Sequence, residues 1–107
     1  MGVYIDDAFI PFGNVPYQMK MSHMIADSAV ELHDMADRIG LNRKWFQSRA
    51  SLPHYDVAKG LRQKAISAGA IPLSGQPFVD KMNEIRSRVA SGAWDADPGA
   101  VAIENLD

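Results

Sequence analysis

The sequence predicts a small α/β domain built on a single sheet, with the element order β-β-α-β-α-β-α. Short β-prone runs alternate along the chain with three amphipathic segments at helical spacing, which is the pattern of an α/β fold. Glycines such as Gly40 and Gly69 stand where these helical segments should end. Because 107 residues make one domain, we expect a compact unit over residues 1–92. An acidic tail, docked or partly disordered, should span residues 93–107.

Two strands are expected before the first helix. Residues 3–5 form a short β-prone run that stops at a pair of aspartates. Residues 8–16 contain prolines, a glycine and an asparagine, which predict a loop. Residues 17–21 alternate apolar and polar side chains and lead into a second strand at 22–27.

The first helix has clear signals at both ends. Ser28 and Glu31 have the spacing of a capping box, in which the two side chains satisfy free amide groups. Gly40 is placed to end the helix in a left-handed turn. The helix is therefore predicted over 28–39, with an apolar stripe formed by Leu32, Met35, Ala36 and Ile39.

A third strand and a second helix are expected next. Residues 45–47 form a third short β-prone run, and we expect Trp45 in the core or in an interface. Residues 48–53 should form a loop. Asp56 is placed to cap a helix over 57–68.

The chain then predicts one more strand and one more helix. Residues 70–74 are β-prone, and Pro72 favours an edge position or a strand end because it lacks an amide hydrogen. The last helix is predicted over 77–90, with an apolar stripe formed by Phe78, Met82, Ile85 and Val89.

Composition and charge exclude several classes of protein. There is no cysteine, which excludes disulfides and thiolate metal sites and is compatible with the cytoplasm. The net charge is −2. All lysines and arginines lie in residues 1–92, yet this part is too weakly basic to indicate binding of duplex nucleic acid. The N-terminus lacks the features of a signal peptide, and no apolar run approaches the roughly 20 residues that span a bilayer.

No strong catalytic motif is present, since a glycine-rich phosphate loop, H-E-x-x-H and G-x-S-x-G are all absent. The functional signal is instead a set of carboxylates and imidazoles. Each lies beside an expected strand end or helix start, where open α/β sheets assemble their sites. The set consists of Asp6, Asp7, His23, Asp27, His54 and Asp56.

Several short motifs together resemble a known family. They are Tyr4-Ile5-Asp6-Asp7, Ser22-His23-Met24-Ile25-Ala26-Asp27, Glu31-Leu32-His33, Trp45-Phe46-Gln47 and His54-Tyr55-Asp56. In combination they are similar to a family of short bacterial and phage proteins catalogued only as a domain of unknown function, number 4031. The similarity covers residues 1–74. It implies a compact intracellular domain and a phage origin, and it brings no activity or catalytic residue with it.

The first functional hypothesis is a binding module for a nucleotide-type or other phosphorylated ligand, which could sequester a nucleotide signal. The N-terminus of the 57–68 helix would offer free amides and a positive dipole end to an anion, with Lys59 and Arg62 adding charge. Trp45 or Tyr55 would stack on a ring. The ligand-binding set is then Asp6, Asp7, His23, Trp45, His54, Tyr55, Asp56, Lys59 and Arg62.

The alternative is a phosphodiesterase or nuclease that depends on a divalent metal. Carboxylates favour Mg²⁺ or Mn²⁺, and added histidines permit Zn²⁺. A metal-activated water would then hydrolyse a phosphodiester. The catalytic set would be Asp6, His23, His54 and Asp56, and the metal ligands would be Asp6, Asp7, His54 and Asp56.

Both hypotheses need the candidate residues to meet at one place. We expect His23, His54, Tyr55 and Asp56 to converge on one pocket with Asp6 and Asp7. The first and third strands would lie parallel and adjacent, joined by a right-handed crossover through the first helix. The small core and the apolar side chains of residues 17–24 also favour a homodimer or a higher homo-oligomer.

Overall fold

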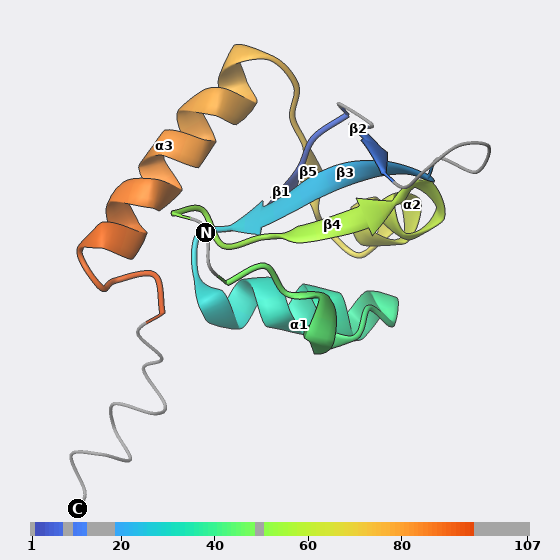
Figure 1. Cartoon of the computed structure of the whole chain (residues 1–107), viewed down its shortest axis with the longest axis horizontal. Coiled ribbons are helices and arrows are strands. Elements are labelled where there is room, and N and C mark those ends of the chain that lie inside the picture. Colours follow the sequence, from blue (N-terminus) through green and yellow to red (C-terminus); the bar gives the residue numbers. More distant parts are fainter. Residues whose placement is uncertain (1, 8–9, 13–18, 49–50, 96–107) are drawn as a thin grey trace, which may run out of the picture.

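A computed structural model describes residues 2–7, 10–12, 19–48 and 51–95. It confirms the predicted α/β class and element order (Figure 1). The elements are β1 (Val3–Ile5), β2 (Ile10–Phe12), β3 (Met19–Ala26), α1 (Ala29–Ile39), a short 3₁₀ helix η1 (Arg43–Trp45), β4 (Tyr55–Ala58), α2 (Lys59–Ser67), β5 (Ile71–Pro72) and α3 (Gln76–Ala90).

Strand β3 is the centre of a mixed sheet. Met24 lies opposite Ile5 of β1 and also opposite Tyr55 of β4, so β1 and β4 flank β3 on its two edges. Both pairings are antiparallel. Strand β2 also pairs antiparallel with β3, at the beginning of β3 and on the same edge as β1. The other edge of β1 pairs in parallel with β5.

Side chains alternate between the two faces of this sheet, as strand geometry requires. On one face, α1 and α2 pack side by side over fully buried residues, among them Ile5, Met24, Tyr55 and Val57. On the opposite face lies α3 (Figure 1). It packs near Tyr4, because the Lys81 Nζ lies 4.6 Å from the centre of the Tyr4 ring.

Helix α1 forms as its capping residues predict. The Ser28 Oγ accepts a hydrogen bond from the Glu31 amide at 3.3 Å and donates one to Glu31 Oε1 at 2.9 Å. Gly40 adopts a left-handed φ of 78°, and its amide donates to the Ala36 and Asp37 carbonyls in the last turn of α1. The predicted stripe of Leu32, Met35, Ala36 and Ile39 is buried. Burial of a large apolar side chain contributes about 1.5–3 kcal/mol, so this stripe fixes α1 on the sheet.

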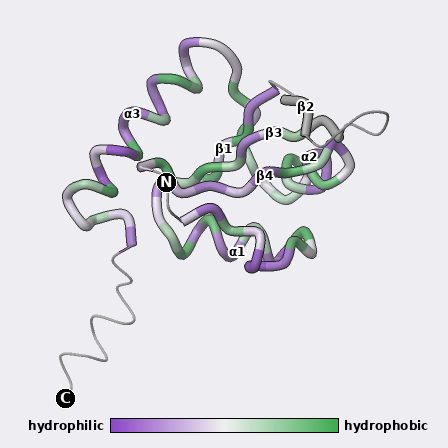
Figure 2. Tube along the Cα trace, in the orientation of Figure 1, coloured by the Kyte–Doolittle hydropathy of each residue, from purple (hydrophilic) through white to green (hydrophobic). Residues whose placement is uncertain are grey.

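Hydrophilic and hydrophobic residues alternate along α3, as in a helix with one apolar face (Figure 2). Its predicted stripe is confirmed, with Phe78 and Ile85 buried and Met82 and Val89 partly buried. The far end of α3 is tied to the end of β3, where the Arg88 Nε donates to the Asp27 carbonyl at 2.8 Å. Beyond the helix, the Trp94 Nε1 donates to the Ala26 carbonyl at 2.8 Å, and the Trp94 ring is buried.

Three expectations about the elements are wrong. Residues 10–12 form β2 inside the predicted loop. Residues 45–47 are not a strand: Trp45 ends η1, and Gln47 forms an isolated bridge with His54. The predicted 57–68 helix begins later, at Lys59, because residues 55–58 pair with β3 as β4.

The expected tail of residues 93–107 lies outside the described residues from residue 96 onward. Within the ranges that the structure describes, no helix is long and apolar enough to cross a membrane.

Candidate metal centre

A cavity of about 290 Å³ lies on the α3 face of the sheet. Its wall combines polar groups from the strands with apolar side chains from α3 and from the segment before β4. The lining residues are Asp6, His23, Ser51, Leu52, His54, Phe78, Met82 and Arg86. A larger hollow of about 510 Å³ lies between α1 and α2. The described residues of its lining include no histidine or carboxylate, so we place the chemistry in the smaller cavity.

The sheet register brings four polar residues together. His23 on β3 lies directly opposite Asp56 on β4. His54 precedes Asp56 by two residues and therefore points to the same face. Asp6 follows β1, and its amide donates to the His23 carbonyl at 3.1 Å, which sets it beside His23. The same alternation turns the neighbours Met24, Tyr55 and Val57 into the core on the other face.

Each histidine ring is held through its Nδ1 atom. The His23 Nδ1 lies 2.7 Å from Asp6 Oδ2, while Asp6 Oδ1 accepts from the His23 amide at 2.8 Å. The His54 Nδ1 lies 2.8 Å from the Leu52 carbonyl oxygen. A carbonyl or an ionised carboxylate can only accept a hydrogen bond, so Nδ1 carries the hydrogen in both rings. In the neutral rings, Nε2 is therefore the atom with the free lone pair.

The two rings and one carboxylate form a cluster of metal-ligand type. His23, His54 and Asp56 each offer one ligand atom, and the three atoms lie within 4.8 Å of one another. The His54 Nε2 lies 3.5 Å from Asp56 Oδ1. A tetrahedral ion with bonds of roughly 2.1 Å needs its ligand atoms about 3.4 Å apart, so this pair already has the required spacing. All three residues are half-buried, which leaves the cluster open to the cavity.

The electrostatics of the cluster favour a positive charge. The hydrogen bond to Asp6 raises the pKa of His23, and the charges of Asp6 and Asp56 act in the same direction, against the lowering effect of burial. The carboxylates that stabilise an imidazolium would equally stabilise a divalent cation. A proton and a metal ion should therefore compete for His23.

The structure brings together part of the predicted site. Asp6, His23 and His54 line one cavity, and Asp56 joins the two histidines. Their meeting does not come from the predicted topology. The parallel neighbour of β1 is β5, and β3 lies between β1 and β4, antiparallel to both.

Other predicted site residues lie elsewhere. Tyr55 is fully buried on the α1 face, where its hydroxyl lies 2.8 Å from the His33 Nδ1, so it cannot stack on a ligand. Trp45 is 56% exposed on η1, with the Lys44 Nζ 5.1 Å from the centre of its ring, so it does not lie in the core, and its place in an interface stays a prediction. Asp27 lies near the start of α1 and accepts hydrogen bonds from Tyr4 and Gly2.

The anion site expected at a helix start is also altered. Asp56 is paired in β4 and does not cap α2, whose N-cap position, Ala58, makes no side-chain bond. Lys59 and Asp7 are exposed and do not line the cavity. Arg62 lies close to the site, because its Nε donates to the Asp6 carbonyl at 2.9 Å.

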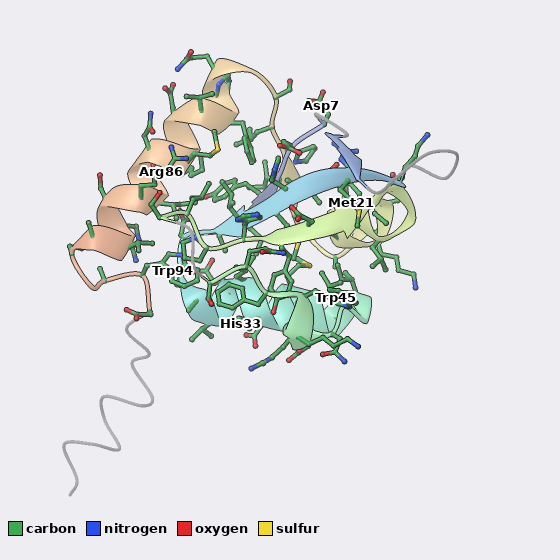
Figure 3. All side chains as sticks on the ribbon, in the orientation of Figure 1. Asp7, Met21, His33, Trp45, Arg86 and Trp94 are labelled. Carbon is green, nitrogen blue, oxygen red and sulfur yellow. The ribbon has the colours of Figure 1, made fainter. Side chains whose placement is uncertain are left out.

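The sequence argument missed Arg86, which lines the cavity from α3. Phe78, Met82 and Arg86 follow one another at intervals of four residues, so they lie on one side of the helix. The sequence signal was an arginine at helical spacing from the apolar residues Phe78 and Met82, which places it on the side of the helix that faces the sheet. Figure 3 shows Arg86 and His33 on opposite sides of the sheet.

Comparison with known proteins identifies one family for most of the chain. The family model described as "Protein of unknown function (DUF4031)" matches residues 3–85, a range that contains Asp6, His23, His54 and Asp56. No curated protein and no solved structure matches the chain.

Proposed function

We propose that this chain, which belongs to the DUF4031 family of proteins of unknown function, is a hydrolase that depends on a divalent metal ion. The ion would bind the Nε2 atoms of His23 and His54 and the carboxylate of Asp56. The substrate would be a phosphoester that enters through the cavity under α3.

The observation that carries this proposal is the fixed orientation of the two imidazoles. Histidines that bind metals usually donate their other ring hydrogen to a carboxylate or a backbone carbonyl. His23 has the first kind of partner, Asp6, and His54 has the second kind, the Leu52 carbonyl. Both rings are thus held in the tautomer that a metal ion requires before any ion arrives.

The number of ligands favours catalysis over a purely structural role. Structural zinc sites are closed by four protein ligands, whereas catalytic sites use three and leave one position for water or substrate. Among the described residues, the cluster contains three ligands and opens into the cavity. Two imidazoles and one carboxylate suit Zn²⁺, Mn²⁺ or Fe²⁺ better than Ca²⁺ or Mg²⁺.

The chemistry is the addition of water across a P–O bond. A divalent ion would supply a water of lowered pKa and would polarise a phosphoryl oxygen. The water oxygen forms a new bond to phosphorus, the ester P–O bond breaks, and the leaving alcohol takes up a proton. Asp6 would act through His23, by holding the ring in place and making it a better electron donor.

A non-catalytic nucleotide-binding module stays a prediction, but the structure removes two of its arguments. Asp56 does not cap α2, and Tyr55 is buried away from the cavity. The predicted homodimer and the cytoplasmic location also stay predictions.

The test combines metal binding with turnover. Calorimetric titration of metal-free protein with Zn²⁺ or Mn²⁺ should show one site per chain, and the loaded protein should hydrolyse bis(p-nitrophenyl) phosphate until EDTA is added. His54→Ala should reduce metal affinity by more than the roughly 10–100-fold that follows loss of an outer partner. His33→Gln is the matched control, because His33 lies on the other face of the sheet, and it should keep wild-type affinity. Equal metal binding by wild type and His54→Ala would refute the proposed centre.

A further inference from the structure

Resting on that proposed function, we infer that the substrate is a small phosphodiester with one negative charge and an apolar substituent. Arg86 would pair with a phosphate oxygen that does not react, and Phe78 and Met82 would hold the substituent. Helix α3 would then select the substrate, while the strands carry the metal.

The position of Arg86 supports a role in binding an anion. It shares the cavity wall with His23 and His54, yet it comes from the opposite side of the cavity, on α3. Its guanidinium has five N–H groups. Among the described residues, the structure shows one hydrogen bond from it, from Nη1 to the exposed Asn83 Oδ1 at 3.2 Å. Donors therefore remain for the two parallel hydrogen bonds that arginine makes to phosphate.

The charges around the cavity favour a single negative charge on the ligand. Counted over the lining residues and the cluster, a divalent ion and Arg86 would bring three positive charges, and Asp6 and Asp56 two negative ones; Arg62 bonds to the backbone of Asp6 and does not line the cavity. The histidines are neutral as metal ligands. The remaining charge of about +1 matches a phosphodiester, whereas a phosphomonoester carries about −1.5 to −2 at neutral pH.

The size and lining of the cavity exclude a long polymer. At about 290 Å³ it lies at the lower end of the range for small-molecule sites. Grooves for single-stranded nucleic acid need a continuous basic track, and among the described residues Arg86 is the one lysine or arginine that lines this cavity. Leu52, Phe78 and Met82 give the rest of the wall an apolar surface suited to an aryl or alkyl group.

Binding and turnover are measured separately, so that this inference and the proposed function can fail independently. The probes are bis(p-nitrophenyl) phosphate, p-nitrophenyl phosphate and a short single-stranded oligonucleotide. Each is titrated into zinc-loaded wild type, Arg86→Gln, Arg86→Lys and the control Arg38→Gln. Arg38 is exposed on α1, on the other side of the sheet, and its replacement makes the same change in charge.

The diester should bind wild type at least about tenfold more tightly than either other probe. Arg86→Gln should raise its Kd, and the KM of any turnover, about tenfold or more, a loss typical of a charged hydrogen bond. Arg86→Lys should recover part of the loss, and metal affinity should stay constant in every variant. An unchanged diester Kd in Arg86→Gln, tighter binding of monoester or oligonucleotide, or no binding of the diester would overturn the inference. Diester binding without hydrolysis would overturn only the proposed catalysis.

Discussion

The two faces of the sheet use the same strands for different purposes. On the face under α1 and α2, Met24 and Tyr55 are fully buried. On the face under α3, their neighbours His23 and Asp56 are half-buried, and His23 lines the cavity. One step along β3 from Met24 to His23, or along β4 from Tyr55 to Asp56, thus changes a core position into a site position.

The two histidines on these faces show what the surroundings do to one type of side chain. His33, on the α1 face, packs against the Phe46 ring at 4.6 Å between ring centres, and burial lowers its pKa. His23 has a carboxylate on its Nδ1, and that hydrogen bond raises its pKa. Of His23 and His33, it is therefore His23 that is prepared to hold a positive charge.

The largest expected difference between the faces is in stability. Met24→Ala should lower the free energy of unfolding by about 2–5 kcal/mol, because it leaves a cavity in the core. The adjacent change His23→Ala should cost less stability but should abolish tight metal binding. Urea unfolding and metal titration of both variants measure the two effects. A loss of metal affinity in folded Met24→Ala equal to that of His23→Ala would contradict the division into faces.

A smaller effect should come from the carboxylate behind His23. Asp6→Asn should weaken metal binding about 10–100-fold, because an amide orients and polarises the ring less well than a carboxylate. It should also lower the pKa of His23. Asp7→Asn is the control, since Asp7 is exposed and adjacent in sequence. If Asp6→Asn and Asp7→Asn bind Zn²⁺ equally well, Asp6 does not position His23.

The smallest effect should be the pH dependence of stability in the metal-free protein. Because the folded pKa of His23 is raised, its stabilising contribution is complete below about pH 6.5 and is lost as the pH rises through that raised pKa. Because the folded pKa of His33 is lowered, stability is instead lost as the pH falls from about 6.5 toward that lowered pKa.

Urea unfolding between about pH 5 and 8.5 measures both slopes, which lie on either side of the ordinary histidine pKa of about 6.5. His23→Gln should flatten the alkaline side only, and His33→Gln the acid side only. A His23→Gln variant that keeps the full alkaline slope would show that another group causes it.

Local patterns predicted the helices of this protein well, because their signals lie within a few residues. Ser28, Glu31 and Gly40 fix the ends of α1 without help from distant parts of the chain. The expected strand over 22–27 likewise turns the adjacent residues His23 and Met24 to opposite faces, and the structure places them so.

The errors arose where pairing over long distances decides the structure. Ala58, Leu61 and Ala65 have helical spacing, which began the predicted helix at residue 57, although residues 55–58 belong to β4. Pairing of those residues with β3 outweighed this local signal and placed Asp56 opposite His23. Arg86 was missed because its importance depends on where α3 packs, which its own sequence does not indicate.

The most direct test of the metal centre is imidazole ¹⁵N NMR during a Zn²⁺ titration, because the chain has three histidines. In the metal-free protein at high pH, His23 and His54 should both carry their hydrogen on Nδ1. One equivalent of Zn²⁺ should shift the Nε2 signals of these two rings together and leave His33 unchanged. Unshifted His23 and His54 signals at saturating Zn²⁺, or coordination through Nδ1, would contradict the account.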